Sequence, residues 1–249
     1  MPLRENDEFD RAVEIQDMVW SYEPSSRMSQ KTFLLASHIG GQVLGAFDGD
    51  ASDVSKMVGY AMSLPGVRDG HAYLHSHHLA VLPEWRNAGV GRRLKLAQRD
   101  DALARGFSLI EWTFDPLEIR NAHLNIARLG AIARRYRRNF YGASTSPLHG
   151  GLPTDRLVAE WWIKSDRVER TLRGEQPHAE IVEHVDVPAA IYEWKASPAT
   201  RDEARKVQEA NAAALEAAFA RGLAVLGYGR NEQGDGSYLL GKWNEDFSY

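Results

Sequence analysis

Hydrophobic residues recur at helical spacing near the N-terminus and at strand spacing further along the chain. Residues 9–20 carry apolar side chains at helical intervals behind Asp7, which predicts a first helix. Residues 33–39 fit a helix or a strand, and the glycines at 40–41 favour a helix that stops there. Three apolar runs predict strands: 42–48, 56–64 and 72–81. Pro65-Gly66 predicts the end of the second of these strands.

The rest of the chain alternates between helical and strand-like patterns. Up to residue 164 we expect these further elements: helices at 92–105 and 118–136, and strands at 107–114, 139–141 and 156–163. Together they predict a mixed α/β domain over residues 1–164. The charged stretch 165–175 looks like a connector to a C-terminal lobe, residues 165–249. In this lobe we expect strands at 180–188, 190–194, 223–227 and 237–243, and a helix that begins at a Thr200–Glu203 capping box.

Composition narrows the class of protein. The 249 residues are 43% hydrophobic and 26% charged, which is an ordinary globular composition. A formal net charge of −4 gives no bulk attraction to nucleic acids or anionic membranes, so we expect neither partner. The chain has no cysteine, which excludes disulfides and thiolate catalysis, and we expect no metal site because no ligand spacing is present. The polar N-terminus and the lack of a long apolar run predict a cytoplasmic protein.

The most informative stretch runs from His75 to Leu94. A predicted strand enters a loop that contains Gly89 and Gly91, and a predicted helix begins at once. Glycines let the backbone approach a phosphate, and the free N–H groups and dipole of the first helical turn attract an anion. A Gly-x-Gly pair alone is more often a plain tight turn. The strand before it and the amphipathic helix after it favour a pyrophosphate site.

This stretch resembles the signature of the GNAT superfamily of N-acyltransferases. In that signature an Arg or Gln is followed by two residues, a Gly, one residue, and then a Gly or Ala. Arg86, Gly89 and Gly91 meet the pattern. The resemblance implies an α/β fold with a mixed, splayed, mostly antiparallel sheet flanked by helices. It also implies acetyl-CoA or another acyl-CoA as co-substrate and an amine as acceptor. The later part of the chain resembles, more loosely, a longer subgroup of the family with a C-terminal extension.

The resemblance also assigns residues to the co-substrate. It implies that the backbone at residues 79–81 pairs with the pantetheine arm, and that the amides of residues 86–91 hold the CoA diphosphate. Asn121 and Asn125 lie one turn apart on a predicted helix that borders the thiol end, although capping or solvent exposure would explain them too. The expected acyl-CoA contacts are Leu79, Ala80, Val81, Arg86, Asn87, Ala88, Gly89, Val90, Gly91, Arg92, Asn121 and Asn125.

Transfer of an acyl group to an ammonium requires a base, because only the neutral amine attacks a thioester. On a regular strand His75 and His77 share one face and His78 points to the other. Imidazole titrates near pH ~6.5, which suits proton removal at neutral pH. Paired histidines at this offset also resemble those of arylalkylamine-type GNAT enzymes. Glu111 is a reserve base, with an exposed strand position as its alternative. For each histidine the alternative is a structural role in local hydrogen bonds.

The general acid is harder to place. Many GNAT enzymes carry a tyrosine on the helix after the motif, and Ile126 stands at that position here. Tyr141 and Tyr136 are substitutes by position, with packing as the alternative role. The missing tyrosine supports a rival function, a CoA-binding regulatory or interaction module without turnover. The basic run 134–138 suits a helix C-terminus, or else it meets an acidic acyl group such as succinyl, a substrate carboxylate or the 3′-phosphate of CoA.

The sequence therefore predicts an N-acyltransferase that acts on a small-molecule amine, with an amino acid as one option. The C-terminal lobe would join the sheet, shape the acceptor pocket or form a homodimer, and the sequence leaves these open.

Overall fold

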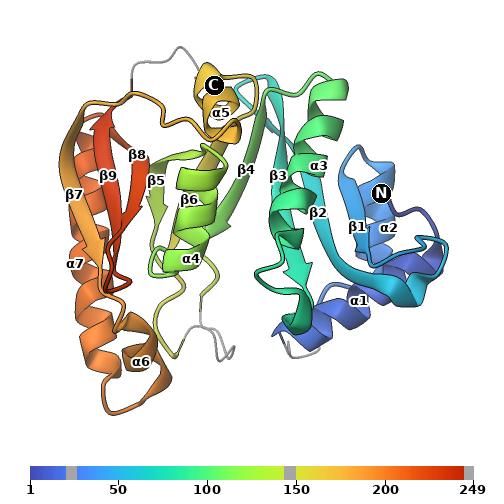
Figure 1. Cartoon of the computed structure of the whole chain (residues 1–249), viewed down its shortest axis with the longest axis horizontal. Coiled ribbons are helices and arrows are strands. Elements are labelled where there is room, and N and C mark those ends of the chain that lie inside the picture. Colours follow the sequence, from blue (N-terminus) through green and yellow to red (C-terminus); the bar gives the residue numbers. More distant parts are fainter. Residues whose placement is uncertain (21–26, 143–149, 244–249) are drawn as a thin grey trace. The chain divides into compact units, whose positions relative to one another are not determined.

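The structure is a computed structural model that describes residues 1–20, 27–142 and 150–243. Its elements can be followed from blue to red in Figure 1. Contacts divide the chain into two compact units, with the boundary between Glu111 and Trp112. This boundary falls inside the strand β4 (Leu109–Phe114). The functional boundary expected at 164/165 stays a prediction.

The first unit begins with two helices, followed by a hairpin-rich sheet and a third helix. Its elements are α1 (Asn6–Trp20), α2 (Gln30–His38), β1 (Gln42–Phe47), η2 (Val54–Lys56), β2 (Met57–Arg68), β3 (His71–Val81), η3 (Pro83–Trp85) and α3 (Val90–Ala104). The hydrogen-bonded order is β1-β2-β3-β4. The first two pairings are antiparallel, and β3–β4 is parallel. Both early helices and all three early strands are predicted by the sequence.

Two apolar clusters cover opposite faces of this sheet. Phe9 of α1 and Phe33 of α2 pack with Tyr60 and Met62 of β2. On the other face Val58 and Ala61 pack with Leu94 of α3. Helices therefore flank both faces, as the α/β prediction requires.

The second strand is longer than the sequence suggests. β2 continues through Pro65-Gly66 to Arg68, and the chain turns at Asp69-Gly70. Both turn residues have positive φ, 48° and 80°, as a two-residue hairpin of type I′ requires. Gly66 fits inside the strand because the ring of Tyr73 covers it, and a Cβ there would lie 2.7 Å from that ring. The prediction that Pro65-Gly66 closes the strand is wrong.

The second unit contains five further strands in the order β6-β5-β8-β9-β7. All its described pairings are antiparallel. Its elements are α4 (Ile119–Ala122), the π-helical turn η4 (His123–Arg128), β5 (Ile132–Arg137), β6 (Arg156–Trp162), α5 (Asp166–Leu172), β7 (Ile181–Val187), α6 (Ile191–Ala196), α7 (Arg201–Ala220), β8 (Leu223–Arg230) and β9 (Gly236–Lys242). With β1 to β4, the described residues form nine strands in a mixed α/β fold, as predicted.

Several elements of the second unit differ from the expectation. The predicted helix 118–136 ends early, because Gly130 takes a left-handed φ of 79° and the following residues form β5. The expected strand 139–141 is a turn, and the expected strand 190–194 lies largely in α6. The expected connector 165–175 contains α5, whose first turn is capped by the Ser165 hydroxyl.

The helix α7 begins where the Thr200–Glu203 pattern predicts. Thr200 precedes it, but its side chain makes no capping hydrogen bond, so only the position of the box is confirmed. The helix packs against β5, β7 and β8. Its buried side chains recur at helical spacing and are Ala204, Gln208, Asn211, Ala212, Leu215 and Ala218. Among the described residues, no helix has the length and apolar character needed to cross a bilayer.

Candidate active site

The loop before α3 has the geometry of an anion site. Residues 86–89 are exposed and connect η3 to the helix. Asn87 and Gly89 both adopt positive φ, 64° and 77°, and Gly89 is the N-cap residue of α3 without a side-chain cap. A Cβ on Gly89 would meet no atom within 4 Å, so the space beside it is open. The first N–H groups of a 15-residue helix therefore face an open, left-handed turn.

The first turn of α3 also supplies positive charge. Arg92 is half-buried, and its Nε is buried without a hydrogen-bond partner among the described residues. A buried guanidinium donor normally has an acceptor, so this atom suits an anion that binds at the helix start. The residues present fit a diphosphate group.

The strand β3 leads into this loop. Its residues Leu79, Ala80 and Val81 pair with Ala61, Tyr60 and Gly59 of β2. The described pairing of β3 with β4 involves only Leu74 and His75. The edge of β3 at residues 79–81 is therefore free of described pairing with β4, as an extended ligand that adds to the strand would require.

The three histidines of β3 do not alternate as a regular strand would place them. His78 pairs with Met62 while Ser76 pairs with Ser63, so His77 is the extra residue of a β-bulge. The rings of His77 and His78 lie stacked, with centroids 4.6 Å apart and planes 16° apart. The ring of His75 lies 6.2 Å from that of His77. The structure thus brings His75 and His77 close together, but the expectation that His78 points away from them is wrong.

Desolvation sets the charge of these rings. It lowers the pKa of His77, although part of that side chain reaches solvent. Burial and, secondarily, the neighbouring His77 lower the pKa of His78 to about 3. Both rings are therefore neutral at neutral pH, which is the form that accepts a proton.

The reserve base Glu111 is not at an exposed position. It is 3% exposed and its carboxylate lies 2.5 Å from the guanidinium of Arg68. Register places it beside His75 on the parallel pair β3–β4. Because its carboxylate is already held by Arg68, the structure favours a positioning role for Glu111.

The two candidate tyrosines of the second unit have different environments. Tyr136 is buried, and its hydroxyl donates to Asp155 at 2.7 Å. Burial, this bond and the charge of Asp155 raise the pKa of Tyr136 far above its ordinary value. Tyr141 is 49% exposed, and its hydroxyl lies 3.0 Å from the hydroxyl of Thr113. Of the two, only Tyr141 has an accessible hydroxyl.

Two further groups of the second unit differ from the simple expectation. Asn121 is exposed and Asn125 is buried, because the π-helical turn η4 interrupts the spacing that would place them on one face.

The basic run lies on β5 rather than at a helix C-terminus. Arg134 and Arg135 both bind the buried carboxylate of Glu160, so they are already paired with an anion.

The sequence analysis missed a buried polar network between α3 and β3. The ammonium of Lys95, 4% exposed, donates to the Ser76 hydroxyl at 2.8 Å. That hydroxyl donates to Gln98 Oε1 at 3.0 Å. Burial lowers the pKa of Lys95 to about 7. Position 76 lies between the two candidate bases, but only the packed structure shows that a lysine reaches it.

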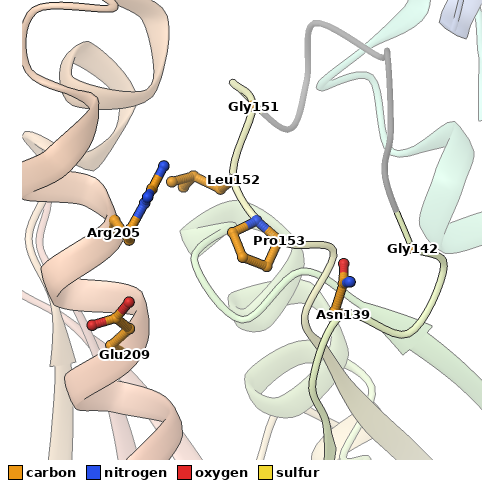
Figure 2. Close-up of a pocket in the computed structure, with 7 residues that line it drawn as sticks. All are labelled: Asn139, Gly142, Gly151, Leu152, Pro153, Arg205 and Glu209. Atoms are coloured by element: carbon orange, nitrogen blue, oxygen red, sulfur yellow. The ribbon is translucent and has the colours of Figure 1, made fainter.

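An open cavity of about 370 Å³ lies in the second unit. Figure 2 shows Arg205 and Glu209 on α7, opposite a wall that includes Leu152 and Pro153. The cavity presents one cation and one anion, and it has room for a small molecule. Among the described residues, no cluster of three or more His, Asp or Glu side chains could hold a metal ion.

Comparisons with known proteins agree with this geometry. Residues 10–130 match the sequence profile described as the Acetyltransferase (GNAT) family. No curated protein matches the sequence significantly.

Three solved structures illustrate the shared fold. A protein described as a GNAT-family acetyltransferase from Desulfovibrio desulfuricans is 15% identical, with a TM-score of 0.51 over 66% of this chain and 97% of that chain. The ribosomal-protein-S18-alanine N-acetyltransferase from Escherichia coli is 20% identical, with a TM-score of 0.51 over 66% and 93%. The NatC complex bound to Gag peptide and CoA contains a chain 14% identical, with a TM-score of 0.50 over 64% and 94%. These structures share the fold of this chain, and residues 10–130 match the GNAT acetyltransferase family.

Proposed function

We propose that this protein is a cytoplasmic N-acyltransferase that moves an acyl group from acyl-CoA to the amine of a small molecule. One observation carries the proposal: the uncapped N-terminus of α3 opens on a left-handed turn at Gly89, a short loop after a strand that carries His77 and His78 in neutral form. This combination supplies an anion site and a base on the same unit.

In the proposed mechanism, the amides of residues 86–91 and Arg92 hold the CoA diphosphate. The free edge of β3 at residues 79–81 orients the pantetheine arm, and a backbone N–H near Val81 donates to the thioester oxygen. Electrostatic donors of this kind stabilise the negative charge that develops on that oxygen during attack.

His77, with His75 beside it, takes a proton from the bound ammonium, directly or through a water molecule. The freed lone pair of the amine forms the new C–N bond, and the C–S bond of the thioester breaks. The CoA thiolate leaves and takes a proton from solvent, and the new amide nitrogen gives up its second proton to water. No acyl-enzyme is required, since the amine attacks the thioester itself.

The acceptor is proposed to be small and charged. The cavity beside α7 presents Arg205 and Glu209, which suit the two charges of an amino acid. Succinyl-CoA remains a candidate donor beside acetyl-CoA. However, the pairing of Arg134 and Arg135 with Glu160 removes the main argument for a dicarboxylic acyl group.

The proposal is tested by thiol release. The protein is incubated with acetyl-CoA or succinyl-CoA and a panel of amines that includes amino acids, and free CoA is measured with a chromogenic disulfide. We expect amine-dependent release that falls by roughly 10²–10⁴ in the His75→Ala/His77→Ala double variant. Unchanged turnover in that variant would eliminate the assigned base.

The rival function is a CoA-binding module without turnover. It is favoured by Ile126, which is buried on η4 where many relatives carry a tyrosine. It predicts that acyl-CoA raises the melting temperature while no amine causes thiol release. No thermal stabilisation by any acyl-CoA would contradict both functions.

A further inference from the structure

Two side chains that the proposed reaction does not use contact His78, the ring that stacks on His77. Nδ1 of His78 lies 3.1 Å from the hydroxyl of Tyr60 on β2. The ring of Trp20, the last residue of α1, lies 4.7 Å from that of His78. His78 is thus held by a strand and a helix, while His77 stacks on its other side.

The supporting tyrosine is itself fully buried. Tyr60 has no exposed surface, and its ring makes an edge contact at 5.3 Å with Phe33 of α2. Aromatic pairs of this geometry add stability beyond their buried area. The contacts form a continuous stack from α2 through β2 to the bulge of β3, ending at a ring that reaches solvent.

Because of the bulge in β3, this series of ring contacts ends at the candidate base His77. Without the extra residue, successive side chains of β3 would lie on opposite faces, and His78 could not contact the ring of His77. A bulge next to an active site commonly re-aims one side chain. Here it turns the exposed imidazole of His77 onto the half-buried imidazole of His78.

We propose that His78, anchored by Tyr60, is a positioning residue that orients His77 and keeps it in the neutral, proton-accepting form. This inference rests on the proposed function, because it assumes that His77 removes the proton from the amine. His78 does not itself exchange protons with the substrate. It supplies a neutral stacked surface that limits the rotation and hydration of the His77 ring.

A neutral partner matters because a charged ring at this distance would disfavour protonation of His77 during the reaction. His78 stays neutral to about pH 3 because it is buried. The other titratable side chains in these contacts are Tyr60 from β2 and His75 from β3, and Trp20 from α1 carries no charge.

The first test measures the pKa of His77 directly by NMR, through its ring-proton resonance in the whole protein. In His78→Ala we expect this pKa to rise toward the ordinary value near ~6.5, because water reaches the exposed face of the ring. His78→Phe keeps a stacking ring and loses only the bond to Tyr60, so we expect a smaller rise. Tyr73→Phe, on the same strand outside the stack, is the matched control and should leave the pKa unchanged. An unchanged His77 pKa in folded His78→Ala and His78→Phe would overturn the inference.

The second test asks whether His78 acts through His77. With acetyl-CoA and the best amine of the panel, His78→Ala should lower kcat/KM roughly tenfold and move the acidic limb of its pH profile upward with the His77 pKa. The double variant His77→Ala/His78→Ala should be no slower than His77→Ala alone, because residues that act as one unit are not additive. Multiplicative losses would overturn the inference.

The two tests separate this inference from the function it rests on. If His77→Ala keeps full turnover while its NMR pKa still responds to His78, the base assignment fails and the contact stands. If His77→Ala is inactive but neither the pKa nor the pH profile responds to His78, only the positioning role fails. Should His78→Ala not fold, Tyr60→Phe with His78→Phe gives the same two readouts.

Discussion

The buried ammonium of Lys95 should destabilise the folded protein near neutral pH. Burial lowers its pKa from 10.5 to about 7. The difference of about 3.5 between the two values corresponds to about 5 kcal/mol of lost stability at pH 6. Because the folded-state pKa is lowered, the unfolded chain binds a proton that the folded chain releases between pH 7 and 10.5. Wild-type stability should therefore rise with pH through this interval, by about 3 kcal/mol from pH 6 to pH 9.5.

The substitution Lys95→Met removes the charge and keeps the length of the side chain. It also removes the hydrogen bond to Ser76, which costs about 1 kcal/mol. The net expectation is a variant more stable than wild type by about 4 kcal/mol at pH 6 and of nearly equal stability at pH 9.5.

Urea unfolding at several pH values from 6 to 9.5, followed by tryptophan fluorescence, measures this difference. The control is Lys56→Met, because Lys56 is exposed at the end of η2 and should leave the pH profile unchanged. Parallel pH profiles for wild type and Lys95→Met would refute the reasoning, since they would mean that Lys95 stays protonated in the folded state.

The remaining predictions concern the candidate site. Gly89→Ala should raise the KM for acyl-CoA, because the left-handed turn is strained by a Cβ and the helix start shifts. The control is Gly106→Ala, which has a similar φ of 85° and equally open space after α3. Each variant should lose ~1 kcal/mol of stability, but Gly106→Ala should leave the KM unchanged. Equal KM values in the two variants would contradict the anion site. Tyr136→Phe should lower stability by about 1–3 kcal/mol in urea unfolding, since the buried Asp155 loses a donor, and a loss of kcat at unchanged stability would argue against this purely structural role.

Local physics explains what the sequence alone predicted correctly. The apolar spacing at residues 9–20 and the glycine pair at 40–41 act within a few residues, so the first helices and strands could be placed. The loop from Arg86 to Gly91 is also local, since left-handed glycine and a free helix N-terminus need no distant partner. The mixed α/β class and the loop-to-helix arrangement at residues 86–91 therefore followed from the chain itself, while anion binding at this loop stays a prediction.

Errors arose where a distant contact decides between two local options. The hairpin turn at Asp69-Gly70 was available in the sequence, but Pro65-Gly66 was the stronger local signal. Only pairing with β3, and Tyr73 lying over Gly66, carries the strand past it. Likewise Gly130 ends η4 and β5 follows, because residues 132–137 gain strand partners on β6 that the sequence does not reveal.

The site itself needed the tertiary structure most. The sequence supplied His75 and His77 and the acyl-CoA loop, but the bulge at His77 depends on how β2 and β3 register, and register is set between strands. The sequence also could not show that Glu111 is paired with Arg68, or that Lys95 is buried against Ser76. Charge and pKa depend on burial and on neighbours brought together by folding, so the residues were present in the sequence while their protonation was decided by the packed structure.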